Sequence, residues 1–186
     1  MAKRRVVLTG LGTVNPLAHT VPEFWSALIA GKSGIRAIRR FDTTGYASRI
    51  GGEVQDWDCV PTDRLDARES KRMDRFTQFA VASGIEAVAD SGIDFEKEDR
   101  ERCGVIVGSG IGGLSELEEQ HKRMLDKGPG RVSPFTVPKL MANAAAGNLS
   151  ILYGLRGPNF AVVTACASAA NSTGEAYRSI LREETD

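Results

Sequence analysis

The sequence has no net charge, few aromatic residues and no long apolar run. Lys plus Arg and Asp plus Glu both number 24 among 186 residues, and aromatic residues make up 6%. A neutral chain creates no long-range field toward nucleic acid or an anionic membrane, and sparse aromatic residues give no pattern for stacking bases. Apolar runs such as residues 105–107 are far shorter than the about 20 residues that span a bilayer. We therefore expect no nucleic-acid partner and no membrane insertion.

Cysteine and histidine are also scarce. The three cysteines are odd in number and widely spaced, which is typical of a reducing compartment and argues against a disulfide framework. The basic start, residues 1–5, leads into an apolar run too short for a signal peptide, so the sequence indicates a cytoplasmic protein. His19 and His121 have no further ligand at metal-binding spacing, and we expect no metal and no cofactor.

Apolar periodicity predicts strands that alternate with helices. With 41% hydrophobic residues the chain can bury a core, and we treat residues 1–186 as one domain. Alternation of this kind is typical of an α/β fold with a largely parallel sheet. The predicted strands are 5–9, 104–108 and 160–165, with a hairpin near 50–54, and the predicted helices are 22–30, 70–89, 114–127, 138–153 and 167–183.

The segment Thr164-Ala165-Cys166-Ala167-Ser168 places a thiol where an apolar strand turns into a helix of small residues. At a helix N-terminus the macrodipole and the free backbone N–H groups favour a thiolate, and the same groups can hold an oxyanion. This setting indicates a nucleophile. The alternative is that Cys166 is a small buried hydrophobic residue, as free cysteines often are. Cys59 and Cys103 lack such a setting, and for them we favour the structural role.

Residues 108–113 read Gly-Ser-Gly-Ile-Gly-Gly between a predicted strand and a predicted helix, which matches the dinucleotide-binding pattern G-x-G-x-x-G. In that fold an acidic residue closes a second apolar strand and binds the ribose. The candidate here, Asp126, instead ends a polar helical stretch. A nucleotide site is therefore the weaker interpretation of this turn.

Basic residues cluster at 36–40 and again over 64–75, at the start of a predicted helix. Such runs usually form a solvated surface. An acidic protein partner is the alternative.

Several motifs follow one another along the whole chain. They are Val7-Leu8-Thr9-Gly10-Leu11-Gly12 with Asn15-Pro16-Leu17, Met73-Asp74-Arg75-Phe76, the glycine turn 108–113, Ser133-Pro134-Phe135, Gly154-Leu155-Arg156-Gly157-Pro158 and Thr164-Ala165-Cys166. In this order and spacing the chain resembles the N-terminal part of a β-ketoacyl-[acyl-carrier-protein] synthase of the synthase II type. The resemblance implies a thiolase-like layered α/β/α fold of two pseudo-equivalent halves, of which residues 1–186 would be an incomplete first half.

The resemblance also implies a reaction. Cys166 would accept an acyl group from a carrier-protein thioester, and malonyl-carrier protein would then lose CO2 and attack that acyl group, as in fatty-acid chain elongation. A thiolate suits both steps, because it is a good nucleophile and a good leaving group. The backbone N–H of Cys166 would hold the oxyanion. By the same resemblance Ile111 would gate the acyl pocket, and Phe135 and Thr136 would belong to the pocket and to the contact between subunits.

Two partners are implied in the same way. Arg68, Lys71 and Arg72 match a basic helix that docks the acidic acyl-carrier protein in similar enzymes. The strand at 160–165 matches one that pairs with its two-fold mate, which implies a homodimer.

The family's decarboxylation step uses two histidines and a lysine of a C-terminal half that these residues do not contain, and His19 and His121 match neither histidine. We therefore expect the segment alone to be unable to condense. The strand at 5–9 would form an exposed apolar edge, because its neighbours in the family belong to the absent sequence. Two alternatives stay open: a condensing domain of a polyketide system, and a non-catalytic partner like a chain-length factor, which generally lacks the cysteine.

Overall fold

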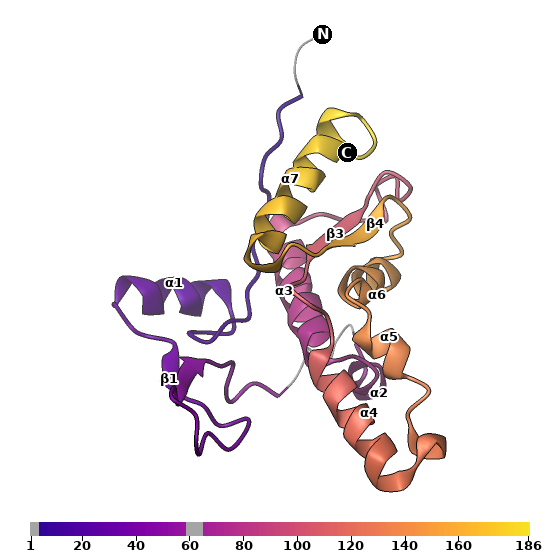
Figure 1. Cartoon of the computed structure of the whole chain (residues 1–186). Helices are drawn as coiled ribbons and strands as arrows, with labels where there is room; N and C mark the ends of the chain where they lie inside the picture. Colours follow the sequence, from indigo (N-terminus) through magenta and orange to yellow (C-terminus); the bar gives the residue numbers. More distant parts are fainter. Residues whose placement is uncertain (1–3, 59–64) are drawn as a thin grey trace. The chain divides into compact units, whose positions relative to one another are not determined.

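The computed structural model describes residues 4–58 and 65–186 (Figure 1). Contacts group these residues into two compact units. The first unit holds residues 4–8, 65–81 and 94–186, and the second holds 9–58 and 82–93. Helix α3 (Arg75–Ser91) contributes residues to both.

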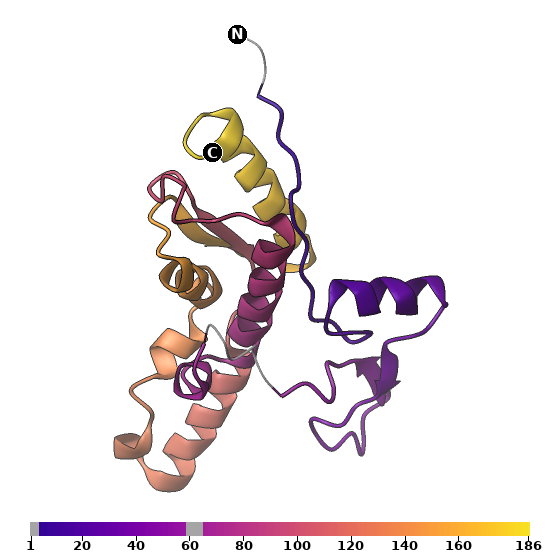
Figure 2. The same ribbon diagram turned by 180° about the vertical axis from the view of Figure 1, so that it is seen from behind.

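A parallel pair of strands forms the centre of the first unit. β3 (Val105–Gly108) pairs in parallel with β4 (Asn159–Val162). Helices α6 (Ala144–Tyr153) and α7 (Ser168–Leu181) both contact the two strands and lie on opposite faces of them (Figures 1 and 2). The chain must cross back between two parallel strands, because the end of the first and the start of the second lie at opposite edges of the sheet, and α6 is part of this crossover. The predicted layered α/β arrangement with a parallel sheet is confirmed.

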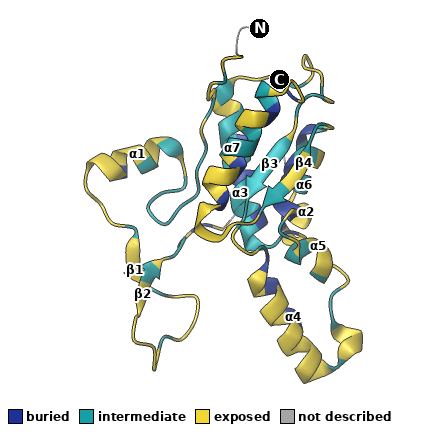
Figure 3. Cartoon of the chain, turned by 45° about the horizontal axis from the view of Figure 1, so that its top comes forward, coloured by how far each residue is buried: buried dark blue, intermediate teal, exposed yellow. Residues whose placement is uncertain are grey.

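Small side chains let these layers approach closely. Ala145 and Ala146 of α6 are fully buried, and so is Val81 of α3. The helix α4 (Leu114–Lys127) is exposed over most of its length (Figure 3) and matches its predicted bounds of 114–127. Within the described residues no helix is both long and apolar enough to cross a membrane.

The helix predicted at 138–153 is split into α5 (Thr136–Leu140) and α6. Met141 has extended backbone angles and ends α5. The carbonyl of Leu140, freed at this break, accepts the backbone N–H of Gly113 at 3.0 Å. A contact distant in sequence therefore stabilises a break that the local pattern does not reveal.

The helix predicted at 70–89 is split as well, into α2 (Ala67–Lys71) and α3. Asp74 lies between them, and its carboxylate accepts the backbone N–H of Phe76 at 3.1 Å. Asp is a preferred N-cap residue, so this side chain begins a new helix where the apolar spacing had predicted a continuous one.

The prediction of a strand at 5–9 is wrong. Residues 4–10 have no regular secondary structure, and Val7 and Leu8 are 65% and 82% exposed. A strand is stabilised by the backbone of a neighbouring strand, and this segment pairs with none among the described residues. Arg4 instead binds the carboxylate of Asp186 at 2.9 Å.

The second unit contains a helix and a hairpin. α1 (Val21–Ile29) begins at Thr20, whose hydroxyl accepts the N–H of Glu23. β1 (Ile35–Ala37) pairs antiparallel with β2 (Ile50–Gly52), so one strand lies within the hairpin predicted near 50–54, while its partner lies at 35–37 and was not predicted.

One carboxylate holds much of this unit together. Glu86 of α3 accepts the backbone N–H of Thr13 with one oxygen at 2.8 Å and that of Val21 with the other at 2.7 Å. The first contact fixes the loop before α1, and the second satisfies a free N–H at the first turn of α1. A single side chain therefore joins three segments.

We predict that Glu86→Ala lowers the free energy of unfolding by about 2–4 kcal/mol, because two backbone N–H groups lose a charged acceptor. Denaturant unfolding followed by circular dichroism measures the change. Glu119→Ala removes an exposed carboxylate from α4 and should stay within about 0.5 kcal/mol of the wild type. Equal effects of the two substitutions would contradict the role of Glu86.

Candidate active site

Cys166 lies in the turn between β4 and α7. After β4 the chain forms a short 3-10 turn, η2 (Ala165–Ala167), and then enters α7. The thiol-bearing residue is exposed, so the alternative of a buried hydrophobic cysteine is wrong. The strand–turn–helix setting is confirmed, although the strand ends at Val162 and not at residue 165, because η2 occupies the positions around the cysteine.

The backbone next to the cysteine is strained. Ala165 has a φ of 50°, in the left-handed region that residues with a side chain rarely adopt. Such a conformation costs roughly 1–3 kcal/mol and persists only where surrounding contacts enforce it. The turn that presents Cys166 therefore depends on contacts that hold it in place.

Ser168 makes those contacts. It is 4% exposed, and its hydroxyl oxygen accepts the backbone N–H of Thr164 at 2.9 Å. The hydroxyl lies 2.7 Å from the carbonyl oxygen of Ala165 and 3.2 Å from that of Ser109, both of which can accept its proton. One buried hydroxyl thus closes the turn around Cys166 and attaches it to the end of β3.

Sequence reasoning gave Ser168 no role. The available signal was its place at the first position of a helix, where serine often bonds to nearby backbone groups. That signal does not show that the hydroxyl spans the cysteine turn, because the folded turn is needed to bring Thr164 and Ser168 together.

The glycine turn 108–113 starts at the end of β3, and its glycines 108, 112 and 113 lie too close to other backbone atoms to carry a side chain. A Cβ on Gly108 would lie 2.5 Å from the carbonyl carbon of Ser168. The N–H of Gly112 donates to the hydroxyl of Ser109 at 3.0 Å, and that of Gly113 donates to Leu140. These two N–H groups are already used, and close packing accounts for Gly108 and Gly113 of the dinucleotide-like pattern, whereas Gly110 has open space beside it.

The backbone N–H of Cys166 is different. It donates to no acceptor in the part of the chain that the structure describes, whereas the next N–H, of Ala167, donates to Thr164 at 3.0 Å. A free N–H beside an exposed thiol at the start of a helix is what an oxyanion donor requires.

Of the residues predicted to line an acyl pocket, Ile111 lies in the glycine turn, and Phe135 and Thr136 lie at the start of α5. Ile111 is 64% exposed and Phe135 is 42% exposed, while Thr136 is half-buried as the first residue of α5. The guanidinium of Arg72 lies over the ring of Phe135, 5.3 Å from its centroid. The structure therefore brings a predicted docking residue onto a predicted pocket residue.

The predicted docking residues share one short element. Arg68 and Lys71 belong to the last turn of α2, and Arg72 follows it directly. All three are exposed. The arrangement leaves their charges accessible to an acidic surface.

The remaining cysteines differ from Cys166. Cys103 is half-buried, and burial, followed by the nearby carboxylates of Glu98 and Asp99, raises the pKa of its thiol. A raised pKa keeps the thiol protonated, which agrees with the structural role we favoured. Cys59 lies outside the described residues.

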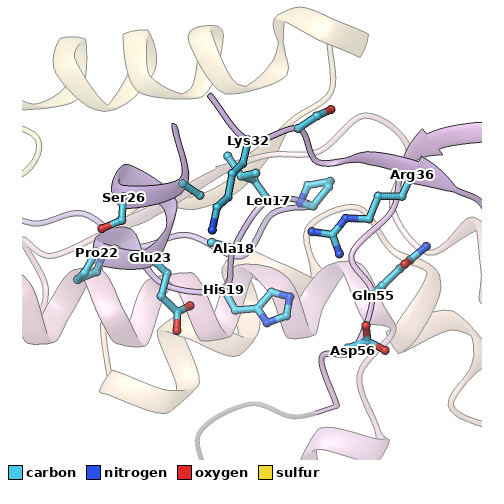
Figure 4. A pocket seen from close by; sticks show the side chains of 13 residues that line it. Leu17, Ala18, His19, Pro22, Glu23, Ser26, Lys32, Arg36, Gln55 and Asp56 are labelled. Atoms are coloured by element: carbon cyan, nitrogen blue, oxygen red, sulfur yellow. The ribbon is translucent and has the colours of Figure 1, made fainter. Parts of the chain in front are cut away.

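A pocket of about 860 Å³ opens in the second unit (Figure 4). Side chains of both charges line it, among them Lys32, Arg36, Glu23 and Asp56, together with His19. None of the site residues predicted from the sequence contributes to this pocket.

The sequence profile described as "Beta-ketoacyl synthase, N-terminal domain" matches residues 3–186. The chain belongs to the β-ketoacyl synthase family. The 3-oxoacyl-[acyl-carrier-protein] synthase 2 of Vibrio cholerae serotype O1 is 46% identical over 186 residues, and the protein of the same name from Staphylococcus aureus strain COL is 44% identical over 183. These matches cover 100% and 98% of this chain and 44% of each relative, so the chain spans less than half of their length.

Solved ketosynthase structures share the fold. The ishigamide ketosynthase/chain length factor superposes with a TM-score of 0.83 at 31% identity, over 100% of this chain and 46% of the other. A β-ketoacyl synthase from Burkholderia phymatum STM815 gives 0.78 at 26% identity, over 98% and 45%. The predicted thiolase-like α/β/α class is confirmed, whereas the pocket and docking residues stay predictions.

We predict that Ser168→Ala slows alkylation of Cys166 by iodoacetamide by roughly tenfold, because the turn loses hydrogen bonds together worth about 1–3 kcal/mol. Mass spectrometry of peptides separates the cysteines, and alkylation of Cys103 should keep rising at pH values above the ordinary thiol pKa. The control is Ser172→Ala: Ser172 is also buried in α7 but bonds only to the carbonyl of Ala169. Equal rates in the two variants would rule out the turn-closing role.

Proposed function

We propose that this chain carries the acyl-accepting centre of a 3-oxoacyl-carrier-protein synthase, an acyltransferase of fatty-acid chain elongation that would act in the cytoplasm. The observation that carries the proposal is the exposed Cys166 in a strained turn, closed by Ser168, at the start of α7. The 46% identity to a 3-oxoacyl-[acyl-carrier-protein] synthase 2 supports it.

In the first half-reaction the Cys166 thiolate attacks the carbonyl carbon of an acyl thioester on a carrier protein. A carbon–sulfur bond forms, and the carbonyl oxygen becomes an oxyanion, to which the free N–H of Cys166 would donate a hydrogen bond. When the oxyanion collapses, the carbon–sulfur bond to the carrier breaks, and the carrier thiolate leaves and takes up a proton. The acyl group then remains on Cys166.

In the second half-reaction malonyl-carrier protein loses CO2, and the electron pair of the broken carbon–carbon bond forms an enolate. The enolate carbon attacks the acyl carbonyl on Cys166, and the cysteine thiolate leaves. We propose that the groups that promote decarboxylation lie outside these residues, so that the 186 residues alone are acylated without condensing. His121 is exposed on α4, as a solvated residue would be.

The acyl chain would lie against Ile111, Phe135 and Thr136, and the acidic carrier protein would dock on Arg68, Lys71 and Arg72. The contact between Arg72 and Phe135 supports placing the two sites side by side. A type II polyketide ketosynthase, solved in complex with its acyl-carrier protein, shares this fold over 49% of its chain, with a TM-score of 0.81.

We also propose that two copies pair through β4. Among the described residues β4 is bonded only to β3, and Phe160 on it is 40% exposed. An unpaired edge with an exposed aromatic side chain is suited to pairing with an identical strand.

A second candidate function is condensation in a polyketide system. The similarity to a ketosynthase/chain length factor, at 31% identity, favours it. The higher identity to synthase 2 proteins favours fatty-acid elongation, and Cys166 argues against a non-catalytic chain-length factor.

Incubation with an acyl-carrier protein should add one acyl mass to the protein. We expect intact-mass analysis to show this adduct in the wild type and in Cys103→Ala, and its loss in Cys166→Ala. Cys103→Ala is the matched control, because it removes a half-buried thiol of raised pKa. An adduct that survives Cys166→Ala, or a folded wild type without one, would contradict the proposed function.

Charge reversal of the docking helix should weaken the binding of acyl-carrier protein without slowing the acylation of Cys166. We expect Arg68→Glu/Lys71→Glu to raise the KM for acyl-carrier protein by roughly tenfold, with an effect that shrinks at high salt. Acylation by a small acyl thioester should be unchanged. The control is Lys122→Glu/Arg123→Glu, an equal charge change on the exposed face of α4. A similar rise in KM in that control would show that the docking site is elsewhere.

A further inference from the structure

Helix α4 is exposed over most of its length, yet two of its polar residues are buried. Glu116 is 5% exposed and Gln120 is 6% exposed. They are four residues apart and therefore share one face of the helix, and α4 contacts α5. A carboxylate buried in an otherwise polar helix needs a compensating partner.

That partner is Lys139 of α5. Its Nζ lies 3.3 Å from Oε2 of Glu116, and the two side chains are 21% and 5% exposed. The other oxygen, Oε1, accepts no hydrogen bond from the described residues. Desolvation largely offsets the attraction within such a buried pair, so the pair is a weak source of stability. What it does fix is the position of α5 on α4.

The same part of α5 supports the glycine turn. A Cβ on Gly112 would lie 2.6 Å from the carbonyl oxygen of Leu140, and one on Gly113 would lie 2.6 Å from that of Lys139. The turn that carries Ile111 therefore rests on the backbone of Lys139 and Leu140. A shift of α5 relative to α4 would move this support.

Gln120 holds the other end of the segment. Its side-chain oxygen accepts the backbone N–H of Ser133 at 2.9 Å. Ser133 in turn accepts the N–H of Phe135 on its hydroxyl at 3.1 Å and the hydroxyl of Thr136 on its carbonyl at 2.7 Å. The buried face of α4 thus holds the segment 133–140 at both ends, with Phe135 and Thr136 between them.

We propose that Glu116 and Lys139 form a positioning pair that determines which acyl chain lengths the enzyme accepts. The pair holds the Ile111 turn at a fixed spacing from Phe135 and Thr136. This rests on the proposed function, because these three residues must line the acyl pocket. Without the pair, α5 shifts against α4, and discrimination between short and long acyl chains weakens while the Cys166 turn is untouched.

The first test compares the kcat/KM values of the full-length protein for hexanoyl and hexadecanoyl substrates. We expect Glu116→Gln and Lys139→Met to change the ratio of their kcat/KM values by roughly fivefold or more, with the rate of hexanoyl transfer to Cys166 nearly unchanged. The charge-swapped Glu116→Lys/Lys139→Glu should restore the ratio to within about twofold of the wild type. The matched control is Glu118→Gln, an exposed carboxylate of the same helix, which should leave the ratio unchanged.

The second test does not depend on activity. Hydrogen–deuterium exchange should become faster at 109–113 and 133–141 in Glu116→Gln and stay at the wild-type rate in Glu118→Gln. Unchanged exchange in these segments would overturn the positioning role, and faster exchange with an unchanged substrate ratio would overturn the specificity role. A wild type that is never acylated would contradict the proposed function and with it the specificity role, while exchange would still decide whether the pair positions the turn.

Discussion

The close approach of β3 to the first turn of α7 is the constraint on which the candidate site depends. At Gly108 the two backbones are so near that a single Cβ would lie 2.5 Å from Ser168. The strands are parallel, so β3 and β4 end at the same edge of the sheet, and the segments that follow them lie next to each other. The hydroxyl of Ser168 joins these segments by its contacts to Ala165 and Ser109. The strained turn around Cys166 is thereby part of the sheet edge and not an independent loop.

The glycine turn lies at the same edge of the sheet as the cysteine turn. It begins at the sheet edge that holds the cysteine turn and ends on the break between α5 and α6, where Leu140 accepts the N–H of Gly113. Glycines at 108, 112 and 113 each face backbone atoms nearer than a Cβ allows, whereas Gly110 has open space beside it. Close backbone contacts therefore account for two of the three glycines that match the dinucleotide motif, Gly108 and Gly113. A short glycine pattern reports close backbone approach, and the approaching element need not be a nucleotide.

Local patterns predicted the elements whose ends are marked locally. Helix α4 lies between Gly113 and Gly128, and both its ends were predicted correctly. The strand–turn–helix setting of Cys166 was also predicted, because an apolar strand followed by small residues indicates a turn into a helix. The predicted strand at 5–9 failed because strand formation depends on a partner that the local pattern does not contain. The breaks in the two long helices were missed for a related reason: Asp74 acts through cap geometry, and Leu140 through a contact with a turn far away in sequence.

The pair of Glu116 and Lys139 shows that local sequence patterns also fail to predict some functional residues. In the sequence Glu116 is one acidic residue among several in a polar helix, and only the fold shows that it alone of these is buried against a lysine of α5. In the proposed function, the chemistry of Cys166 would need a helix start, a free N–H and a hydroxyl that closes the turn. Selection of substrate length would need the spacing between two elements, which no local feature sets. A buried ion pair suits this task because its weak contribution to stability leaves its geometric requirement, two groups at one distance, as its main effect. Under this proposal reactivity and selectivity are held by different contacts, and substitutions at one set should leave the other intact.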